Sequence, residues 1–140
     1  MTTAIDTNVL VSLWDRDPEL NLAAQNALDG AQARGSLIVA APVFAELMAF
    51  PGRDQAFLNT FFQEAGIAVD WNLNETIWRT AGEAFQSYAA RRRRHGATGP
   101  RRILADFVIG AHALRRAYAL LTLDERLYRA AFPGLEIMSI

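Results

Sequence analysis

The chain has 140 residues and a formal net charge of −1, and hydrophobic residues make up 51% of it. This length suits one domain with a single core, and the apolar share argues against intrinsic disorder. The absence of cysteine excludes disulfides, thiolate zinc sites and cysteine nucleophiles. The start of the chain lacks a basic region, and the longest wholly apolar run covers only residues 37–45. We therefore expect no signal peptide, no membrane span and a soluble cytoplasmic protein.

Apolar patterning predicts that strands and helices alternate along the chain. The helix over 18–34 begins at Pro18 and stops at Gly35, and the run 37–40 is apolar on both faces, as in buried parallel strands. The predicted strands are 3–6, 37–40, 67–70, 119–122 and 135–139. The predicted helices are 18–34, 42–50, 54–64, one from 75 into a run of arginines, 103–116 and 125–131. This alternation predicts an α/β fold with a mostly parallel sheet.

Four acidic residues fall where parallel sheets bind ligands, outside the carboxyl ends of the strands. Asp6 ends the first strand, and Asp124 comes two residues after Thr122, the end of the fourth strand. Glu46 lies one turn into the helix after the second strand, and Asp106 lies in the first turn of the helix before the fourth. If the first and fourth strands are neighbours, these carboxylates converge on one crevice. We therefore expect the first strand at the centre, between the second and the fourth.

Carboxylates gathered in one crevice repel one another, and their pKa values rise unless a cation neutralises them. Hard oxygen ligands select Mg²⁺ or Mn²⁺, which activate water and steady the charge of a phosphate. Each acid also has an ordinary structural interpretation. Asp6 and Asp124 could cap helices, and Glu46 could pair with an arginine. Asp106 could pair with Arg102 or cap its own helix.

Four short motifs resemble, in order, those of PIN domains. They are IDTNVL at 5–10, PVFAEL at 42–47, LADFVIGA at 104–111 and LLTLD at 120–124. The resemblance covers essentially the whole chain, which we interpret as one PIN-like nuclease domain over residues 1–140. This small single-domain form is most similar to the VapC-type toxins of bacterial toxin–antitoxin pairs.

The resemblance implies a three-layer sandwich around a five-stranded parallel sheet, in the order 3-2-1-4-5. It implies an endoribonuclease that cleaves structured RNA with Mg²⁺ or Mn²⁺, and a cognate antitoxin as partner. Catalytic and metal-binding roles carry over to Asp6, Glu46, Asp106 and Asp124, and supporting roles carry over to Asn8 and Thr122.

All 14 basic residues are arginine, and six of them lie between positions 91 and 102. This block consists of Arg91, Arg92, Arg93, Arg94, Arg101 and Arg102. It flanks a loop with Gly96, Gly99 and Pro100 that leads to Asp106. We interpret the block as an RNA-phosphate contact. The alternatives are a solvated helix end whose cations suit the helix dipole, and a contact with an acidic antitoxin tail.

The aromatic residues of the two short helices predict a partner surface. Phe61 and Phe62 are adjacent, so both can hardly point inward, and we expect a homodimer or another protein partner. His95 and His112 lack the spacing of metal ligands, and we expect structural or surface roles for both.

Three other functions share parts of this pattern. A haloacid-dehalogenase-type phosphatase needs a second acid at the position of Asn8, and a response-regulator receiver needs a lysine, which the chain lacks. An inactive PIN fold that only holds RNA or a partner stays open.

Overall fold

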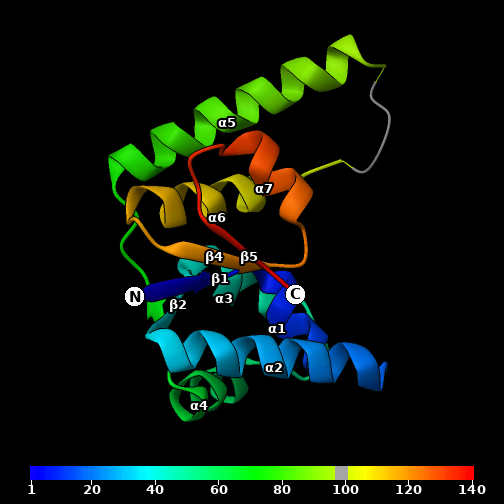
Figure 1. The fold of residues 1–140 in the computed structure, drawn as a ribbon, viewed down its shortest axis with the longest axis vertical. Helices are drawn as coiled ribbons and strands as arrows, with labels where there is room; N and C mark the ends of the chain where they lie inside the picture. Colours follow the sequence, from blue (N-terminus) through cyan, green and yellow to red (C-terminus); the bar gives the residue numbers. More distant parts are fainter. Residues whose placement is uncertain (97–100) are drawn as a thin grey trace.

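The computed structural model describes residues 1–96 and 101–140, and within them one parallel sheet forms the centre of the molecule (Figure 1). Its strands are β1 (Thr2–Ile5), β2 (Ser36–Ala40), β3 (Ile67–Asp70), β4 (Ala119–Thr122) and β5 (Ile137–Ser139). The strand order is β3-β2-β1-β4-β5, and every pairing is parallel. The predicted α/β class, strand order and central place of the first strand are confirmed.

Helices cover both faces of this sheet. They are α1 (Thr7–Ser12), α2 (Pro18–Arg34), α3 (Ala41–Leu47), α4 (Gln55–Ala65), α5 (Glu75–Arg94), α6 (Leu104–Arg115) and α7 (Glu125–Ala131). Helices α5, α6 and α7 stack on one side of the sheet, and α2 and α4 lie on the other, which gives the three expected layers (Figure 1). Among the described residues, none of these helices combines the length and the hydrophobicity that a bilayer span requires.

Local sequence explains most of the helix ends. The carboxylate of Asp54 accepts from the Phe57 amide at 2.8 Å and starts α4, and the side chain of Asn74 starts α5 in the same way. Gly66 ends α4 with a left-handed φ of 68°, which a residue without Cβ adopts at little cost.

Three elements differ from the prediction by more than one residue. Helix α1 was not predicted as an element of its own, because its six residues are too few to show a helical period. Helix α3 stops at Leu47 instead of Phe50, because the next residues form a tighter turn in which Phe50 N donates to Leu47 O. Strand β5 begins later than expected, because the Leu135 amide donates to Phe132 O within a turn. Gly99 and Pro100 of the predicted loop lie outside the described residues.

The core lies on both faces of β1 and β4, which are buried almost throughout. Helix α6 packs closely beside the end of α7, and Gly110 makes this possible. A Cβ at Gly110 would lie 2.2 Å from the ring of Phe132, too close for any side chain. Because Asp106 lies one turn before Gly110 on α6, this contact also fixes where the Asp106 carboxylate can stand.

Candidate functional site

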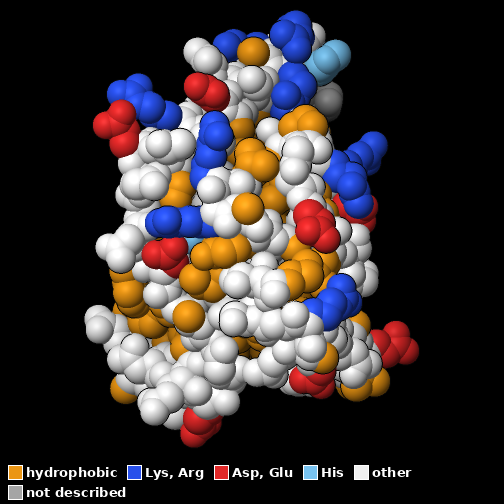
Figure 2. All heavy atoms as spheres, turned by 60° about the vertical axis from the view of Figure 1, so that its left-hand side comes forward, with side chains coloured by type: hydrophobic (Ala, Val, Ile, Leu, Met, Phe, Trp, Pro, Cys, Tyr) orange, Lys and Arg blue, Asp and Glu red, His pale blue; other side chains and the backbone are white. Residues whose placement is uncertain are grey.

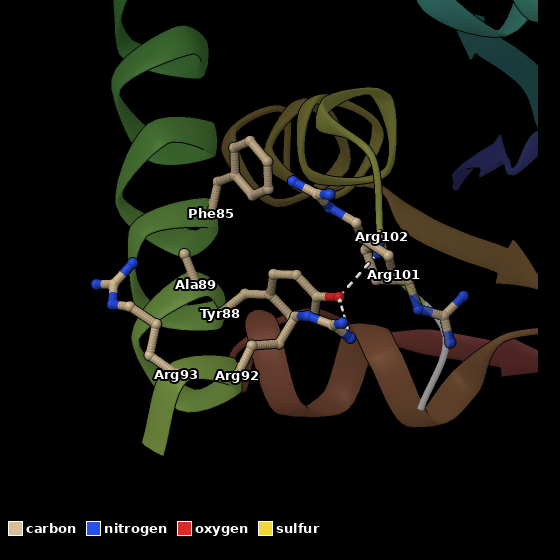
Figure 3. A pocket seen from close by; sticks show the side chains of 7 residues that line it. All are labelled: Phe85, Tyr88, Ala89, Arg92, Arg93, Arg101 and Arg102. Atoms are coloured by element: carbon tan, nitrogen blue, oxygen red, sulfur yellow. Dashed lines mark hydrogen bonds between the residues drawn. The ribbon is translucent and has the colours of Figure 1, made fainter. Parts of the chain in front are cut away.

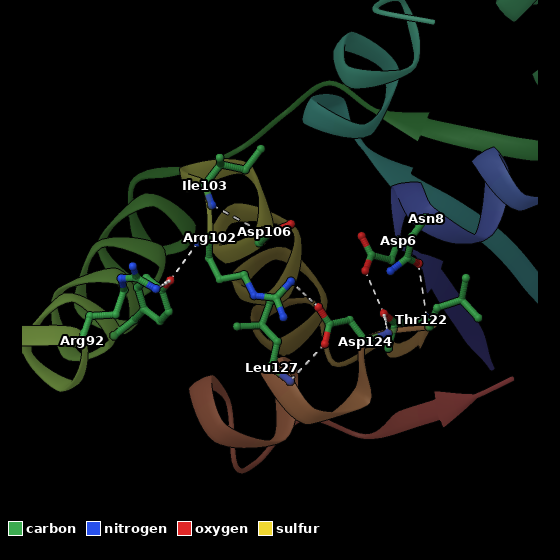
Figure 4. Close-up of polar contacts among 11 residues, drawn as sticks. Asp6, Asn8, Arg92, Arg102, Ile103, Asp106, Thr122, Asp124 and Leu127 are labelled. Atoms are coloured by element: carbon green, nitrogen blue, oxygen red, sulfur yellow. Dashed lines mark hydrogen bonds and ion pairs between the residues drawn. The ribbon is translucent and has the colours of Figure 1, made fainter. Parts of the chain in front are cut away.

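A pocket of about 610 Å³ opens beyond the ends of β1 and β4. All four acidic residues of the sequence motifs line it, and we call it the carboxylate pocket. They are Asp6, Glu46, Asp106 and Asp124. Asp6 follows β1, Glu46 lies on α3, Asp106 lies in the first turn of α6 and Asp124 precedes α7. Figure 4 shows three of them, from β1, α6 and the loop after β4, around a common space. The fold thus gathers carboxylates that are up to 118 residues apart, from 6 to 124.

Asp6 is the most buried of the four, at 4% exposure. Its pKa is raised to about 6: burial raises it most, the hydrogen bond from Thr122 lowers it and the charge of Asp106 raises it. The Thr122 hydroxyl donates to Asp6 Oδ2 at 2.8 Å. The side chain of Asp6 makes no capping hydrogen bond to α1, so the helix-cap interpretation does not describe it. No ion pair to Asp6 forms among the described residues.

Tyr128 is a neighbour of Asp6 that the sequence interpretation missed. It is fully buried on α7, and its hydroxyl has no hydrogen-bond partner of ordinary geometry among the described residues. The hydroxyl nevertheless lies close enough to Asp6 to lower the pKa of that carboxyl. We interpret the contact as a close approach of the two groups and not as a formed hydrogen bond. Burial and the nearby carboxylates raise the pKa of the Tyr128 phenol, so it stays protonated as a donor. Tyr128 lies four residues after Asp124 and therefore on the same helix face, and this spacing could have predicted its place beside the pocket.

Glu46 is held by a second residue that was missed. The Thr7 hydroxyl donates to Glu46 Oε1 at 2.6 Å. Partial burial raises the pKa of Glu46, the bond from Thr7 lowers it, and the charge of Asp106 raises it. No arginine forms an ion pair with Glu46 in the described part of the chain, so the arginine-pairing interpretation finds no support there.

Asp106 and Asp124 share the influence of one arginine. Burial raises the pKa of Asp106, and the Ile103 amide and the charge of Arg102 lower it. The direct partner of Arg102 is Asp124, at 2.6 Å between Nη1 and Oδ2 (Figure 4). Asp124 also accepts from the Leu127 amide at 3.4 Å and so caps α7, as its structural interpretation expected. Arg102 therefore pairs with Asp124 and not with Asp106, whereas the alternative that Asp106 caps its own helix is confirmed, since Asp106 Oδ2 accepts from the Ile103 amide at 3.4 Å.

Asn8 and Thr122 tie the ends of the two central strands together. Asn8 Oδ1 accepts from the Leu123 amide at 3.2 Å. Thr122 Oγ1 accepts from the Asp124 amide at 2.9 Å while its own hydrogen points to Asp6. These contacts hold the loop after β4 against Asp6 and the start of α1 (Figure 4).

Comparison with known proteins decides the family. The model of the PIN domain matches residues 3–133. The chain belongs to the PIN-domain family. This membership places it apart from the phosphatases and receiver domains considered as rivals. No curated protein sequence matches the chain.

Solved structures with the same fold include several complexes. VapBC2 from Rickettsia felis, bound to a DNA fragment from their promoter, aligns at a TM-score of 0.69 and 18% identity, covering 99% of this chain and 98% of that one. FitAcB from Neisseria gonorrhoeae aligns at 0.64 and 20% identity, covering 97% and 96%. A toxin–antitoxin complex from Klebsiella pneumoniae aligns at 0.57 and 18% identity, covering 97% and 95%. At these identities the likeness shows the shared fold.

The donor set of this PIN domain fits a hard divalent cation. All the acidic groups offer oxygen, and burial with mutual repulsion raises the pKa of Asp6, Glu46 and Asp106. Within residues 1–96 and 101–140, no three acidic or histidine side chains already stand close enough together to enclose an ion. A cation would remove the repulsion that these carboxylates impose on one another.

The arginine block of the PIN domain divides between two environments. Arg91 and Arg92 are half-buried on the last turn of α5, and Arg93 and Arg94 are exposed. Arg102 is the only member of the block that lines the carboxylate pocket, as far as the described residues define it. Figure 2 shows basic side chains crowding the end of the molecule where α5 terminates.

A cluster of aromatic residues, which we call the aromatic surface, lies beside α1 and α4. Trp14 packs edge-on against Phe57 and Phe61, with ring centroids 5.8 and 5.2 Å apart, and the Arg53 guanidinium lies 4.4 Å above the Trp14 ring. Phe62 is buried at 5% exposure while Phe61 stays half-buried, as expected for adjacent helical residues. The aromatic surface is therefore partly open to solvent.

The histidines lie apart from the carboxylate pocket. His95 is exposed, whereas His112 is fully buried on α6, with Nε2 3.0 Å from Asp70 Oδ2. The Arg116 guanidinium lies 3.6 Å from the same oxygen and donates to Asn72 O. This histidine network closes the end of β3.

Proposed function

We propose that this PIN domain is an Mg²⁺- or Mn²⁺-dependent endoribonuclease. The observation that supports it most is the meeting of Asp6, Glu46, Asp106 and Asp124 in one pocket, three of them with raised pKa values. Buried carboxylates that lack a cationic partner are costly, and a metal ion is the partner that their oxygens suit.

The four carboxylates would hold the ion, and the surrounding residues would hold the carboxylates. Thr122 orients Asp6 and Thr7 orients Glu46, so these two carboxylates are positioned before any ligand arrives. A bound divalent ion supplies an activated water and neutralises charge on the phosphate. Arg102 can contact a phosphate of the substrate when Asp124 turns to the ion.

The direct test is cleavage of a structured RNA in Mn²⁺ and in EDTA. We expect cleavage by the parent in Mn²⁺, none in excess EDTA, and none by Glu46→Gln in either. Asp29→Asn is the matched control, because Asp29 is an exposed acid on α2 far from the pocket, bonded only to Gln25 among the described residues. It should cleave like the parent. Product at unchanged yield in EDTA would refute the metal mechanism, and retention of RNA without cleavage in Mn²⁺ would favour an inactive binding module.

We propose that the protein is the toxin of a toxin–antitoxin pair, acting in the cytoplasm. Similar folds occur in VapBC2, in FitAcB and in a toxin–antitoxin complex. The aromatic surface offers the antitoxin a place to bind. A cavity of about 570 Å³ beside Trp14 shares Val11 and Phe50 with the carboxylate pocket, so a partner lying there could reach the acids.

This partnership is tested by co-expression with the product of the neighbouring reading frame. We expect a stable complex that suppresses cleavage, and we expect Trp14→Ala to weaken it. Ile140→Ala is the control, since Ile140 is an exposed apolar residue that lines none of the cavities beside the aromatic surface. A parent that cleaves equally well with and without the product of that frame would contradict the proposal.

We also propose that the protein self-associates. Trp71 and Trp78 are 60% and 47% exposed, near the end of β3 and the start of α5, and a second copy of the chain would cover both rings. Sedimentation over a range of concentrations should show a dimer, and Trp78→Arg should shift it to a monomer. A parent that stays monomeric at high concentration would oppose this.

A further inference from the structure

A second cavity, of about 320 Å³, lies between the last turns of α5 and the residues that lead into α6. Figure 3 shows two aromatic rings and four arginines around it. The rings are Phe85 and Tyr88, and the arginines are Arg92, Arg93, Arg101 and Arg102. We call it the aromatic–arginine pocket. It is separate from the carboxylate pocket, and Arg102 lines both.

The aromatic side of this pocket is fixed by packing. The Phe85 ring is stacked on the buried Phe107 ring, with centroids 4.8 Å apart, and Tyr88 lies 5.3 Å from Phe107. The Tyr88 hydroxyl accepts from the backbone amide of Arg102 at 2.8 Å (Figure 3). This bond ties the residues before α6 to α5, so the two walls of the pocket are joined without a ligand.

The charged side of the pocket selects an anion. Four arginines contribute to its lining, and no carboxylate lines it in the described part of the chain. Guanidinium groups bind phosphate through paired hydrogen bonds and also stack on flat rings. A ligand that meets both walls therefore carries a planar ring and a negative charge close together. A nucleotide has both, and the cavity volume is in the range of small-ligand pockets.

The connection through Arg102 relates this pocket to the chemistry proposed above. Arg102 reaches Asp124 of the carboxylate pocket at 2.6 Å, while its backbone amide is bound to Tyr88. A strand with one phosphate at the carboxylates would therefore pass directly to the aromatic–arginine pocket. We propose that this pocket is a nucleotide subsite: it holds one unpaired RNA nucleotide near the cleaved bond, its base against Phe85 and Tyr88 and its phosphate against the arginines. The inference rests on the proposed ribonuclease function.

The same charges could attract an acidic peptide, but the rings distinguish the two ligands. Nucleobases stack on aromatic side chains whatever their sequence, whereas aspartate and glutamate offer no such face. Stacking of an unpaired base is also how proteins commonly read single-stranded RNA. RNA is thus the ligand that uses both walls of the pocket.

The test measures binding without cleavage, in EDTA, with a fluorescein-labelled single-stranded RNA hexanucleotide. Phe85→Leu keeps the apolar filling and removes the aromatic face, and we expect it to weaken binding about fivefold or more. Arg93→Gln should weaken binding and lower the slope of log K against log salt by about 0.7. Arg94→Gln is the matched control, because Arg94 is an equally exposed neighbour on α5 that does not line the pocket. It should change binding by less than Arg93→Gln does.

A change in the RNA provides a test that does not depend on the variant's folding. Hexanucleotides with an abasic residue at each position in turn should show one position where the parent loses about fivefold in affinity. At that position Phe85→Leu should lose nothing further, since the two changes remove the same contact. Affinity that is insensitive to every abasic position, or equal effects of Arg93→Gln and Arg94→Gln, would overturn the subsite.

The outcomes separate this inference from the proposed function. A parent that cleaves RNA in Mn²⁺ while Phe85→Leu and Arg93→Gln bind like the parent retains its function and loses the subsite. A parent that shows the abasic pattern in EDTA but never cleaves retains the subsite and loses the function. Binding of a glutamate-rich peptide in place of the RNA would overturn the nucleotide assignment.

Discussion

Asp6 and Asp70 occupy equivalent places in the sheet and meet opposite surroundings. Asp6 follows β1 and Asp70 ends β3, both at the carboxyl edge of parallel strands. Partial burial raises the pKa of Asp70, but the hydrogen bond from His112 and the charge of Arg116 outweigh it, and the pKa lies below its ordinary value. Burial and the charge of Asp106 raise the pKa of Asp6 to about 6. A strand end alone therefore does not mark a functional carboxylate.

The difference lies in whether the fold supplies the counter-charge. At Asp70 the chain supplies the positive charge of Arg116 and a hydrogen bond from His112, so the group is a structural support. At Asp6 the chain supplies hydroxyl groups and further acids, and no ion pair forms among the described residues, so the proposed metal ion would be its counter-charge. The carboxylate pocket is consequently less stable by itself than it would be with a cation, and this is a property that a metal-binding site needs.

The largest expected effect separates the two residues in catalysis. Asp6→Asn removes a proposed metal ligand and should lower the rate of RNA cleavage in Mn²⁺ at least about 100-fold, since a metal ion stabilises the transition state by several kcal/mol. Asp70→Asn should leave the rate per folded molecule within about threefold, because Asp70 does not line the pocket. Single-turnover cleavage by both variants, scaled to the folded fraction, measures the contrast. Equal losses would remove the distinction.

The second effect is on stability, and its sign is opposite for the two residues. The pKa of Asp6 is about 6 in the folded protein against an ordinary 3.8. Ionisation of Asp6 therefore lowers the free energy of unfolding of the metal-free protein. This loss is absent below about pH 4 and complete above about pH 6. At about 1.4 kcal/mol per pKa unit, this cost is about 3 kcal/mol. Metal-free Asp6→Asn should be more stable than the parent by up to that amount near neutral pH, and equal to it near pH 4.

Asp70→Asn should change stability in the opposite direction. The pKa of Asp70 is lowered by its partners, so its contribution is present above the ordinary pKa and is lost as the pH falls. Removing its charge leaves buried His112 without its carboxylate and should cost about 1–3 kcal/mol near neutral pH. Urea unfolding of both variants in EDTA, repeated across the acid range, decides the signs. A strongly destabilised Asp6→Asn would mean that Asp6 is a structural carboxylate like Asp70.

Metal binding should produce a third contrast of similar size. A ligand that binds only the folded state, at 100 times its dissociation constant, adds about 2.7 kcal/mol. Mn²⁺ should therefore raise the melting temperature of the parent and of Asp70→Asn, and Asp6→Asn should lose most of that gain. Thermal melts with EDTA and with Mn²⁺ make the measurement. A parent that melts at the same temperature in both would argue against the pocket as a metal site.

The smallest predicted effect concerns the helix that the two regions share. Gly110 lies on α6 between Asp106 of the carboxylate pocket and His112 of the histidine network. Gly110→Ala would press a methyl group into the Phe132 ring, 2.2 Å away, and should cost about 1–3 kcal/mol through displacement of α6. We expect lower stability together with slower cleavage. Ala111→Gly, one residue on, is a control that weakens the helix without a clash, and it should affect cleavage less than stability.

The topology of the sheet could be predicted from the sequence because its strands have clear local apolar patterns. The runs at β2 and β4 are apolar on both faces, and the short connections between elements leave few arrangements. The acids of the carboxylate pocket could be located because they follow strands or open helices. Their placement required no knowledge of side-chain contacts.

What could not be predicted depends on contacts between distant segments. Arg102 is four residues from Asp106, which suggested a pair, yet it precedes α6 and its side chain reaches the loop after β4 instead. Tyr128 approaches Asp6, and Thr7 bonds to Glu46, only because separate helices and strands pack at particular positions along one another. Asp70 has the same local pattern as Asp6, and only the approach of His112 from α6 distinguishes them.

The pairing of β1 with β4 also governs when the pocket can exist during synthesis. The backbone amide of Asp6 donates to Leu121 O at 2.9 Å, so the first strand obtains its second neighbour only after more than a hundred residues have been made. Its pairing with β2 is far more local in sequence. A chain still emerging from the ribosome can form the first half of the sheet, but it lacks α6, β4 and two of the four carboxylates. Because long-range contacts form late, whatever chemistry this pocket performs is withheld until the chain is nearly complete.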